Sequence, residues 1–315
     1  MGTGTCMRAP GWITAAVALV GLIAACTSDR APELPPSSDT AVIAARVMGA
    51  EGQAFLSDLL AASWDDDGRR AGELFAWIPR DAQSDDPAAA TRAGETAHAI
   101  ASFLADERDT IAETPANSDL WRSFADSLIP YLGALVGDDR RISGFASLDG
   151  LNSQMRRAAS LFAAMTKDSE ANRAWVDAAD AKALEYEQAF AKAAVADPLQ
   201  ADSGDAQRDL LRAARLRSLV ATGDRLANPD APRPVPTYAE TAVMYQVASL
   251  TARDDDPQIN EKFFRDGRLL PIDEIPEEDR SIYRAQLRVY LVPWPQIGAA
   301  IERYARTYST IADGQ

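Results

Sequence analysis

The chain has 315 residues, two cysteines, a single histidine and a formal net charge of −15. The excess of acid argues against nucleic acid as a partner, because affinity for nucleic acid comes largely from neutralising phosphates. One histidine and two cysteines cannot build the zinc motifs that use paired histidines or cysteines. We therefore expect no metal and no other cofactor.

The first 25 residues have the composition of a secretory signal peptide. Arg8 is the only charged side chain before Cys26, and an uncharged, mostly apolar run occupies residues 12–25. A helix that spans a bilayer needs roughly 20 apolar residues, whereas the core of a signal peptide is shorter. We therefore predict that residues 1–25 are a signal peptide.

Cys26 follows Ile23, Ala24 and Ala25, and this stretch resembles the lipobox of bacterial lipoproteins. The resemblance implies that the Cys26 sulfur carries a diacylglyceryl group, with fatty acyl chains such as palmitate, and that the signal is cut just before Cys26. Two acyl chains give a stable anchor, since each buried methylene contributes roughly 0.8 kcal/mol. We expect an extracytoplasmic protein held on the outer face of the cell membrane. The alternative is an ordinary signal peptide in which Cys26 occurs by chance.

Residues 26–40 lack apolar periodicity and are rich in proline and serine, which predicts a flexible tether. Cleavage would remove Cys6, and lipidation would use Cys26. No cysteine would then remain for a disulfide, so stability must come from packing. The processed chain would have a formal charge of −16 rather than −15, because the signal carries one arginine and no acid.

Helical periodicity dominates the chain after the tether. Apolar residues recur at helical spacing over 41–63, where Gly49 and Gly52 are expected to break or bend the helix. Asp86 followed by Pro87 predicts the cap and the first residue of another helix, because aspartate accepts from free amides and proline needs none.

The middle of the chain predicts two long helices, at about 169–196 and 205–226, and Pro198 ends the first of them. Before these two helices, another helix is expected to begin near residue 117, and Pro130 should kink it.

The last third begins with four prolines in 229–236, which indicate a stiff connector. Thr237 and Glu240 have the spacing of a capping box for the next helix. Two final helices are expected at about 276–291 and 295–312. A series of short β-branched alternations, which would indicate strands, is missing from the sequence.

These elements predict an all-α fold, an irregular multi-helix bundle of roughly ten helices without disulfides. The helical bundle is expected to span 41–228 and the Pro-rich connector 229–236. Residues 237–315 are expected to form a C-terminal helical segment that packs on the bundle.

The residues that could carry chemistry form no recognisable catalytic set. His98 falls off the apolar stripe of its predicted helix, so we expect it on the surface. The aspartates at 65–67 and 254–256 do not match the ligand register of an EF-hand and favour solvated turns or helix starts. Carboxylate pairs are too numerous to single out the acid of a glycosidase. We predict no catalytic residue.

Arg217 is the one charged side chain that we single out in the helix at 205–226. It lies among apolar residues, on the face opposite Arg208, Arg212 and Arg215. If that apolar face is buried, Arg217 needs an acidic partner or must extend to solvent. The two interpretations are a structural ion pair and a contact with an anion or a partner protein.

Three stretches resemble a family of uncharacterised mycobacterial and other actinobacterial proteins that contain a TPR repeat region. They are AGETAHAIASFLADERD, YLGALVGDDRRISGF and FFRDGRLLPIDEIPEEDR. The resemblance covers the chain from about Ala54 to its end. It implies a helical domain but no particular activity and no catalytic residues. The lipobox distinguishes this chain from family members that carry a secretion-linked helical module.

We therefore expect a lipid-anchored, non-enzymatic helical protein that serves as a binding or scaffold module for an envelope protein. Its contact with the membrane would be the covalent lipid on Cys26. One alternative is a carrier of a lipid or small hydrophobic ligand in a cavity between helices. A helical cell-wall glycosidase is a further alternative.

Overall fold

A computed structural model of the chain describes residues 32–36, 38–138, 140 and 142–314. The predicted signal peptide at 1–25, the lipobox and residues 26–31 and 37 of the tether lie outside these residues, and the expectations for them stay predictions. Across the described ranges, no helix has both the length and the apolar composition that crossing a bilayer requires.

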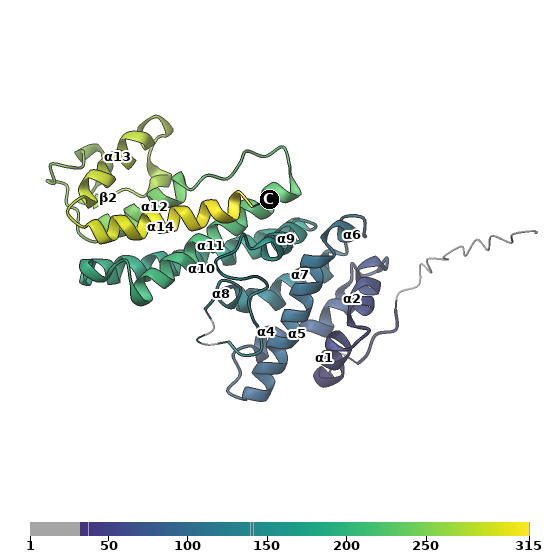
Figure 1. Cartoon of the computed structure of the whole chain (residues 1–315). Coiled ribbons are helices and arrows are strands. Elements are labelled where there is room, and N and C mark those ends of the chain that lie inside the picture. The colour runs from purple at the N-terminus through teal and green to yellow at the C-terminus, as the bar shows by residue number, and fades with distance from the viewer. Residues whose placement is uncertain (1–31, 37, 139, 141, 315) are drawn as a thin grey trace, which may run out of the picture.

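The prediction of an all-α, multi-helix fold is confirmed. In the part of the chain that the structure describes, ten helices have nine or more residues, and β-structure is limited to one two-stranded hairpin. Helices close in sequence lie close in space, from the N-terminal group through α10 and α11 to α14 (Figure 1).

The N-terminal group comprises eight helices and two 3₁₀ turns. They are α1 (Thr40–Met48), α2 (Gly52–Ala61), α3 (Arg69–Gly72), η1 (Glu73–Phe75), α4 (Ile78–Asp81), α5 (Pro87–Asp106), α6 (Arg108–Ala112), α7 (Ser118–Leu128), η2 (Ile129–Tyr131) and α8 (Leu132–Leu135).

Local signals in the sequence explain several of these boundaries. A Cβ on Gly52 would lie 1.8 Å from the Val47 carbonyl oxygen, so the predicted helix at 41–63 turns sharply here and becomes α1 and α2. The Asp86 side chain accepts from the Ala88 amide at 3.0 Å, and Pro87 is the first residue of α5, as predicted. The predicted kink at Pro130 is the 3₁₀ turn η2.

The central layer consists of α9 (Arg156–Met165), α10 (Ser169–Ala196), η3 (Pro198–Gln200) and α11 (Gly204–Ala227). The Asp168 side chain caps α10 by accepting from the Glu170 and Ala171 amides. Helices α10 and α11 pack along each other, and α14 packs on the other side of α11 (Figure 1).

The C-terminal group comprises α12 (Thr237–Ala248), η4 (Glu261–Phe263), β1 (Phe264–Arg265), β2 (Arg268–Leu269), η5 (Ile272–Glu274), η6 (Glu277–Asp279), α13 (Arg280–Leu291) and α14 (Pro295–Ala312). The hairpin was not predicted. Asp266 and Gly267 both have positive φ, which suits a two-residue turn between antiparallel strands. Two residues are too few for a strand pattern to be visible in the sequence.

The predicted capping box at Thr237 and Glu240 is wrong. Thr237 lies inside α12, the residue before it is Pro236, and no side chain caps this end of the helix. Glu240 instead accepts from Arg288 of α13 at 2.7 Å. The Glu240 carboxylate, which the sequence pattern predicted to cap α12, therefore forms an ion pair with another helix instead.

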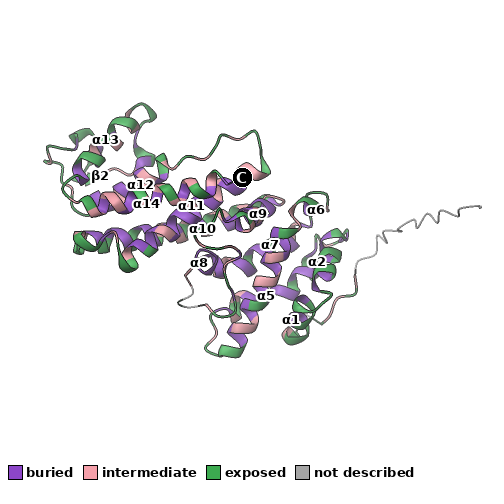
Figure 2. Cartoon of the chain, in the orientation of Figure 1, coloured by how far each residue is buried: buried purple, intermediate pink, exposed green. Residues whose placement is uncertain are grey.

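One apolar core runs through all three groups, as the buried residues in Figure 2 show. Trp121 of α7, Trp175 of α10 and Tyr304 of α14 are each at most 1% exposed. Burial of an apolar side chain contributes about 1.5–3 kcal/mol. Many such side chains stabilise the fold without any cross-link among the described residues.

Candidate functional site

Arg217 forms an ion pair inside the bundle. Its Nε lies 3.0 Å from Glu187 Oε1, its Nη2 lies 3.1 Å from Glu187 Oε2, and its Nη1 lies 2.8 Å from Asp180 Oδ1. Glu187 is fully buried, and this burial raises its pKa while Arg217 opposes the rise. Of the two interpretations of Arg217, the structure shows the ion pair, which joins α10 to α11. Because each of these nitrogens already contacts a carboxylate, an anion or a partner protein would have to compete with Glu187 and Asp180 for them.

His98 is half-buried rather than a plain surface residue. Its ring meets Phe145 edge-on, with 5.4 Å between the ring centroids. Burial and the positive charge of Arg157 hold the pKa of the His98 imidazole below its usual value of 6.5. The expectation of a surface position is wrong here because the loop that carries Phe145 folds back over α5.

Both aspartate clusters form turns, as the sequence predicted. The Asp67 carbonyl accepts from the Asp119 amide at 3.0 Å, so the first cluster docks on the start of α7. In the second cluster, the Asp256 side chain accepts from the Gln258 amide at 2.9 Å.

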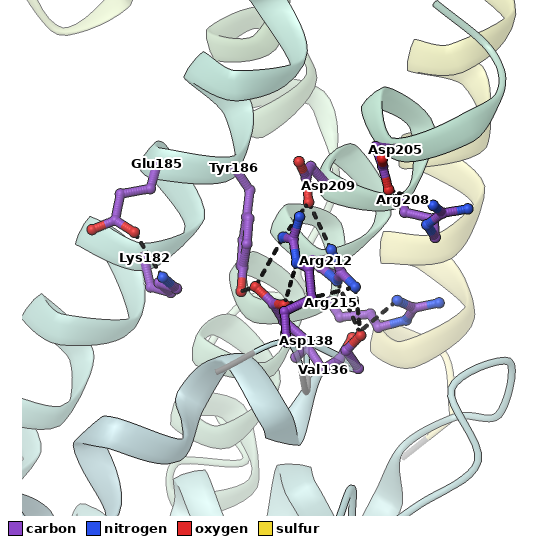
Figure 3. A network of polar contacts seen from close by, with 12 residues as sticks. Val136, Asp138, Lys182, Glu185, Tyr186, Asp205, Arg208, Asp209, Arg212 and Arg215 are labelled. Atoms are coloured by element: carbon purple, nitrogen blue, oxygen red, sulfur yellow. Dashed lines mark hydrogen bonds and ion pairs between the residues drawn. The ribbon is translucent and has the colours of Figure 1, made fainter. Parts of the chain in front are cut away.

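A polar network that the sequence did not predict joins the segment after α8 to α10 and α11 (Figure 3). Asp138 follows α8 and lies next to Tyr186 of α10, whose hydroxyl donates to Asp138 Oδ2 at 2.7 Å. Arg140 donates to Asp138 Oδ1 through Nε at 2.7 Å. The hydrogen bond from Arg140 holds the pKa of Asp138 well below its usual range, although burial opposes this. Burial and the Asp138 charge raise the pKa of Tyr186.

Helix α11 completes the network with Asp209 and two arginines (Figure 3). Asp209 Oδ1 accepts from Arg212 Nη1 at 2.7 Å and from Arg140 Nη2 at 3.1 Å. Arg212 also donates to the Gly137 carbonyl through Nε and Nη2. Arg215 donates to the carbonyl oxygens of Val136 and Leu151 at 3.1 and 3.0 Å.

These buried arginines hold the segment after α8 against α11. The spacing of Asp209 and Arg212, three residues apart on one helix, is the signal in the sequence that could have suggested the local pair. No sequence pattern connects Arg212 to Gly137, because the two residues are 75 positions apart.

A cleft of about 880 Å³ opens above this network. Its floor includes Asp138, Tyr186 and Asp209, and one wall is the turn between α4 and α5. Lys182 of α10 lies on another side, 5.1 Å from the Tyr186 ring, and donates to Glu185 at 2.8 Å. The cleft is therefore lined by charged groups that the fold already holds in place.

The titration of Asp138 and Tyr186 argues against proton transfer by these two groups near neutral pH. The pKa of Asp138 lies well below its usual range and that of Tyr186 lies above it, so both keep one protonation state. A general acid or base works best when its pKa is near the working pH. Fixed charges and hydroxyls suit recognition of a ligand instead.

A second, smaller hollow of about 280 Å³ lies at the ends of α6, α9 and α11. Arg108, Asp109 and Lys167 are among its lining residues. In neither hollow is the lining purely apolar, and both are open to solvent. Within the described ranges, no group of three or more histidine, cysteine or acidic side chains is placed to hold a metal ion.

Comparison with known proteins finds no family model, no curated protein and no solved structure that matches the chain.

Proposed function

We propose that the chain is a lipid-anchored, extracytoplasmic binding module whose cleft receives an extended segment of an envelope protein. The observation that carries this proposal is the 880 Å³ cleft with its preorganised polar floor. Its volume lies within the range of about 300–1,000 Å³ that ligand pockets occupy. An extended segment that enters an open cleft can match several fixed charges at once.

The contacts that hold the floor carboxylates in place favour binding over catalysis. Asp138 accepts from two donors that come from different elements, and Asp209 does the same. Such preorganised groups lose little side-chain freedom when a ligand arrives, which improves affinity. The general acid of a glycosidase needs a pKa raised towards neutral, and Asp138, whose pKa is lowered, does not fit that role.

In this proposal, the lipid anchor and the tether determine where the module lies in the cell. The lipobox at Ile23, Ala24, Ala25 and Cys26 implies a lipid on the outer face of the membrane, and the proline- and serine-rich segment holds the bundle away from it. A carrier of lipid would need an enclosed apolar cavity, and neither hollow provides one. No observation on the described residues favours that alternative.

Photo-crosslinking in cells tests the proposal. A photoreactive residue replaces Gln83, which lines the cleft mouth, and the control carries it at Glu302, an exposed position of α14 outside the cleft. We expect one envelope protein to be captured reproducibly from position 83 and not from position 302. The proposal fails if position 83 captures no protein or only what position 302 also captures.

A further inference from the structure

One arginine of this chain already occupies the space between two carboxylates of the cleft floor. Arg140 Nε lies 2.7 Å from Asp138 Oδ1, and Nη2 lies 3.1 Å from both Asp138 Oδ2 and Asp209 Oδ1. The Arg140 side chain is 51% exposed, whereas the side chains of Asp138 and Asp209 are only 14% and 12% exposed. The cation therefore lies on the solvent side of two anions that belong to the floor.

The two anions are held in place independently of Arg140. The Tyr186 hydroxyl donates to Asp138 at 2.7 Å, and Arg212 donates to Asp209 at 2.7 Å. Arg212 is itself buried and is fixed by the Gly137 carbonyl. The acceptor pair would thus keep its geometry if the Arg140 side chain turned out into solvent.

The geometry and the charge of this site select a guanidinium. A planar guanidinium can donate to two carboxylates at once, whereas an ammonium acts as a single point of charge. The lining of the cleft carries Asp85, Asp138, Glu185 and Asp209 against Arg140 and Lys182. The acids outnumber the bases, and displacing Arg140 from the floor increases the local excess of acid.

We propose that Asp138 and Asp209 form a receptor for an arginine side chain of the partner segment, and that Arg140 is an internal occupant which this arginine displaces. This inference rests on the proposed function of the cleft. Arg140 is tethered two residues from Asp138, so it competes at an effective concentration in the millimolar range. The displacement exchanges one guanidinium for another at the same two carboxylates, so neither of these largely buried charges loses its partner.

Chemical rescue of an Arg140→Ala variant of the full chain tests the receptor. The probe is agmatine, which has a guanidinium and an ammonium group, and the matched compound is cadaverine, which has two ammonium groups. We expect agmatine to raise the Tm of the variant with the logarithm of its concentration above Kd, by about 2–4 °C at tenfold excess over Kd. Wild type should need at least about tenfold more agmatine for the same shift, because Arg140 competes. Cadaverine should have a smaller effect.

Two control variants test whether agmatine acts at Asp138 and Asp209. Arg140→Ala combined with Asp209→Asn should lose the response to agmatine. Arg265→Ala removes a 63% exposed arginine that pairs with Glu274 outside the cleft, and it should show no rescue. If Arg140→Ala does not fold, Arg140→Gln takes its place with the same expectations. The inference is overturned if agmatine does not raise the Tm of the variant, or if cadaverine matches agmatine.

The rescue experiment and the crosslinking experiment can each fail independently of the other. Agmatine needs no partner protein, so absence of rescue with specific crosslinking at position 83 would overturn the arginine receptor alone. Rescue without specific crosslinking would support the receptor and contradict the proposed protein partner.

Discussion

Arg212 and Arg217 both belong to α11, and both side chains contact partners inside the molecule. Arg217 binds the carboxylates of Asp180 and Glu187 on α10, whereas Arg212 binds Asp209 and the Gly137 carbonyl. A buried guanidinium is tolerated only when its donors are satisfied. The two residues therefore stabilise different junctions, one between two helices and one between a helix and a loop.

Replacement of Arg217 by methionine should destabilise the fold by about 3–5 kcal/mol, because it leaves the buried Glu187 carboxylate without its partner. The measurement is the free energy of unfolding in urea. Arg208→Met is the matched control, since Arg208 on the same helix pairs with an exposed aspartate and its loss should cost about 1 kcal/mol or less. Equal losses for the two variants would contradict the structural role of Arg217.

His98 should make the stability of the protein depend on pH. Its pKa in the folded state lies below the usual 6.5, so its contribution is present above pH 6.5 and is lost as pH falls through 6.5 towards the folded pKa. His98→Gln should remove this part of the pH dependence. Because the chain has one histidine, proton NMR reads its titration without ambiguity, and we expect a midpoint below 6.5.

Arg157 contributes to that shift through its positive charge. Arg157→Gln should therefore raise the midpoint of His98, whereas Arg173→Gln, at an exposed position of α10, should leave it unchanged. A wild-type midpoint at or above 6.5 would contradict the half-buried position of the imidazole.

At the scale of elements, close backbone contact fixes the loop that borders the cleft. A Cβ on Gly94 of α5 would lie 1.9 Å from the Ser143 carbonyl oxygen, and one on Gly144 would lie 2.2 Å from the Thr91 carbonyl oxygen. The segment around Ser143 can lie on α5 only because both positions lack side chains. Ser143 lines the cleft, so this contact also sets the position of one wall.

Gly94→Ala should lower the stability by about 1–3 kcal/mol, since the added methyl forces the loop away from α5. Thermal unfolding and amide exchange over residues 142–148 measure the effect. Gly298→Ala is the control, because a Cβ there meets nothing within 4 Å and helix α14 should gain about 0.5–1 kcal/mol. Unchanged stability and exchange in Gly94→Ala would show that the loop adapts without cost.

At the scale of the whole molecule, we propose that the lipid anchor sets where the protein lies and that the cleft binds its partner. We predict that the membrane-extracted protein begins at Cys26 and carries a diacylglyceryl mass, which mass spectrometry measures. Cys26→Ser should move the protein out of the membrane fraction. Cys6→Ser is the matched control and should leave it there, because Cys6 belongs to the removed signal. An anchored, unmodified Cys26→Ser variant would refute the lipid anchor.

The sequence predicted most of the helices because their signals are local. The bounds of α10 and α14 agree with those expected from periodicity and from Pro198 and Pro295, and Asp86 caps α5 as expected. The prediction failed where a local pattern had a tertiary competitor, as at Glu240, which binds Arg288 rather than a helix end.

By itself the sequence determined the helical class, the main helix boundaries and a charge that disfavours nucleic acid, since each follows from composition or short-range spacing. Only the tertiary structure decided the partner of Arg217, the half-buried state of His98 and the network at Asp138. These depend on residues far apart in the chain, such as Arg212 and Gly137. Burial then sets which charges are paired and which pKa values move, and no local pattern encodes it.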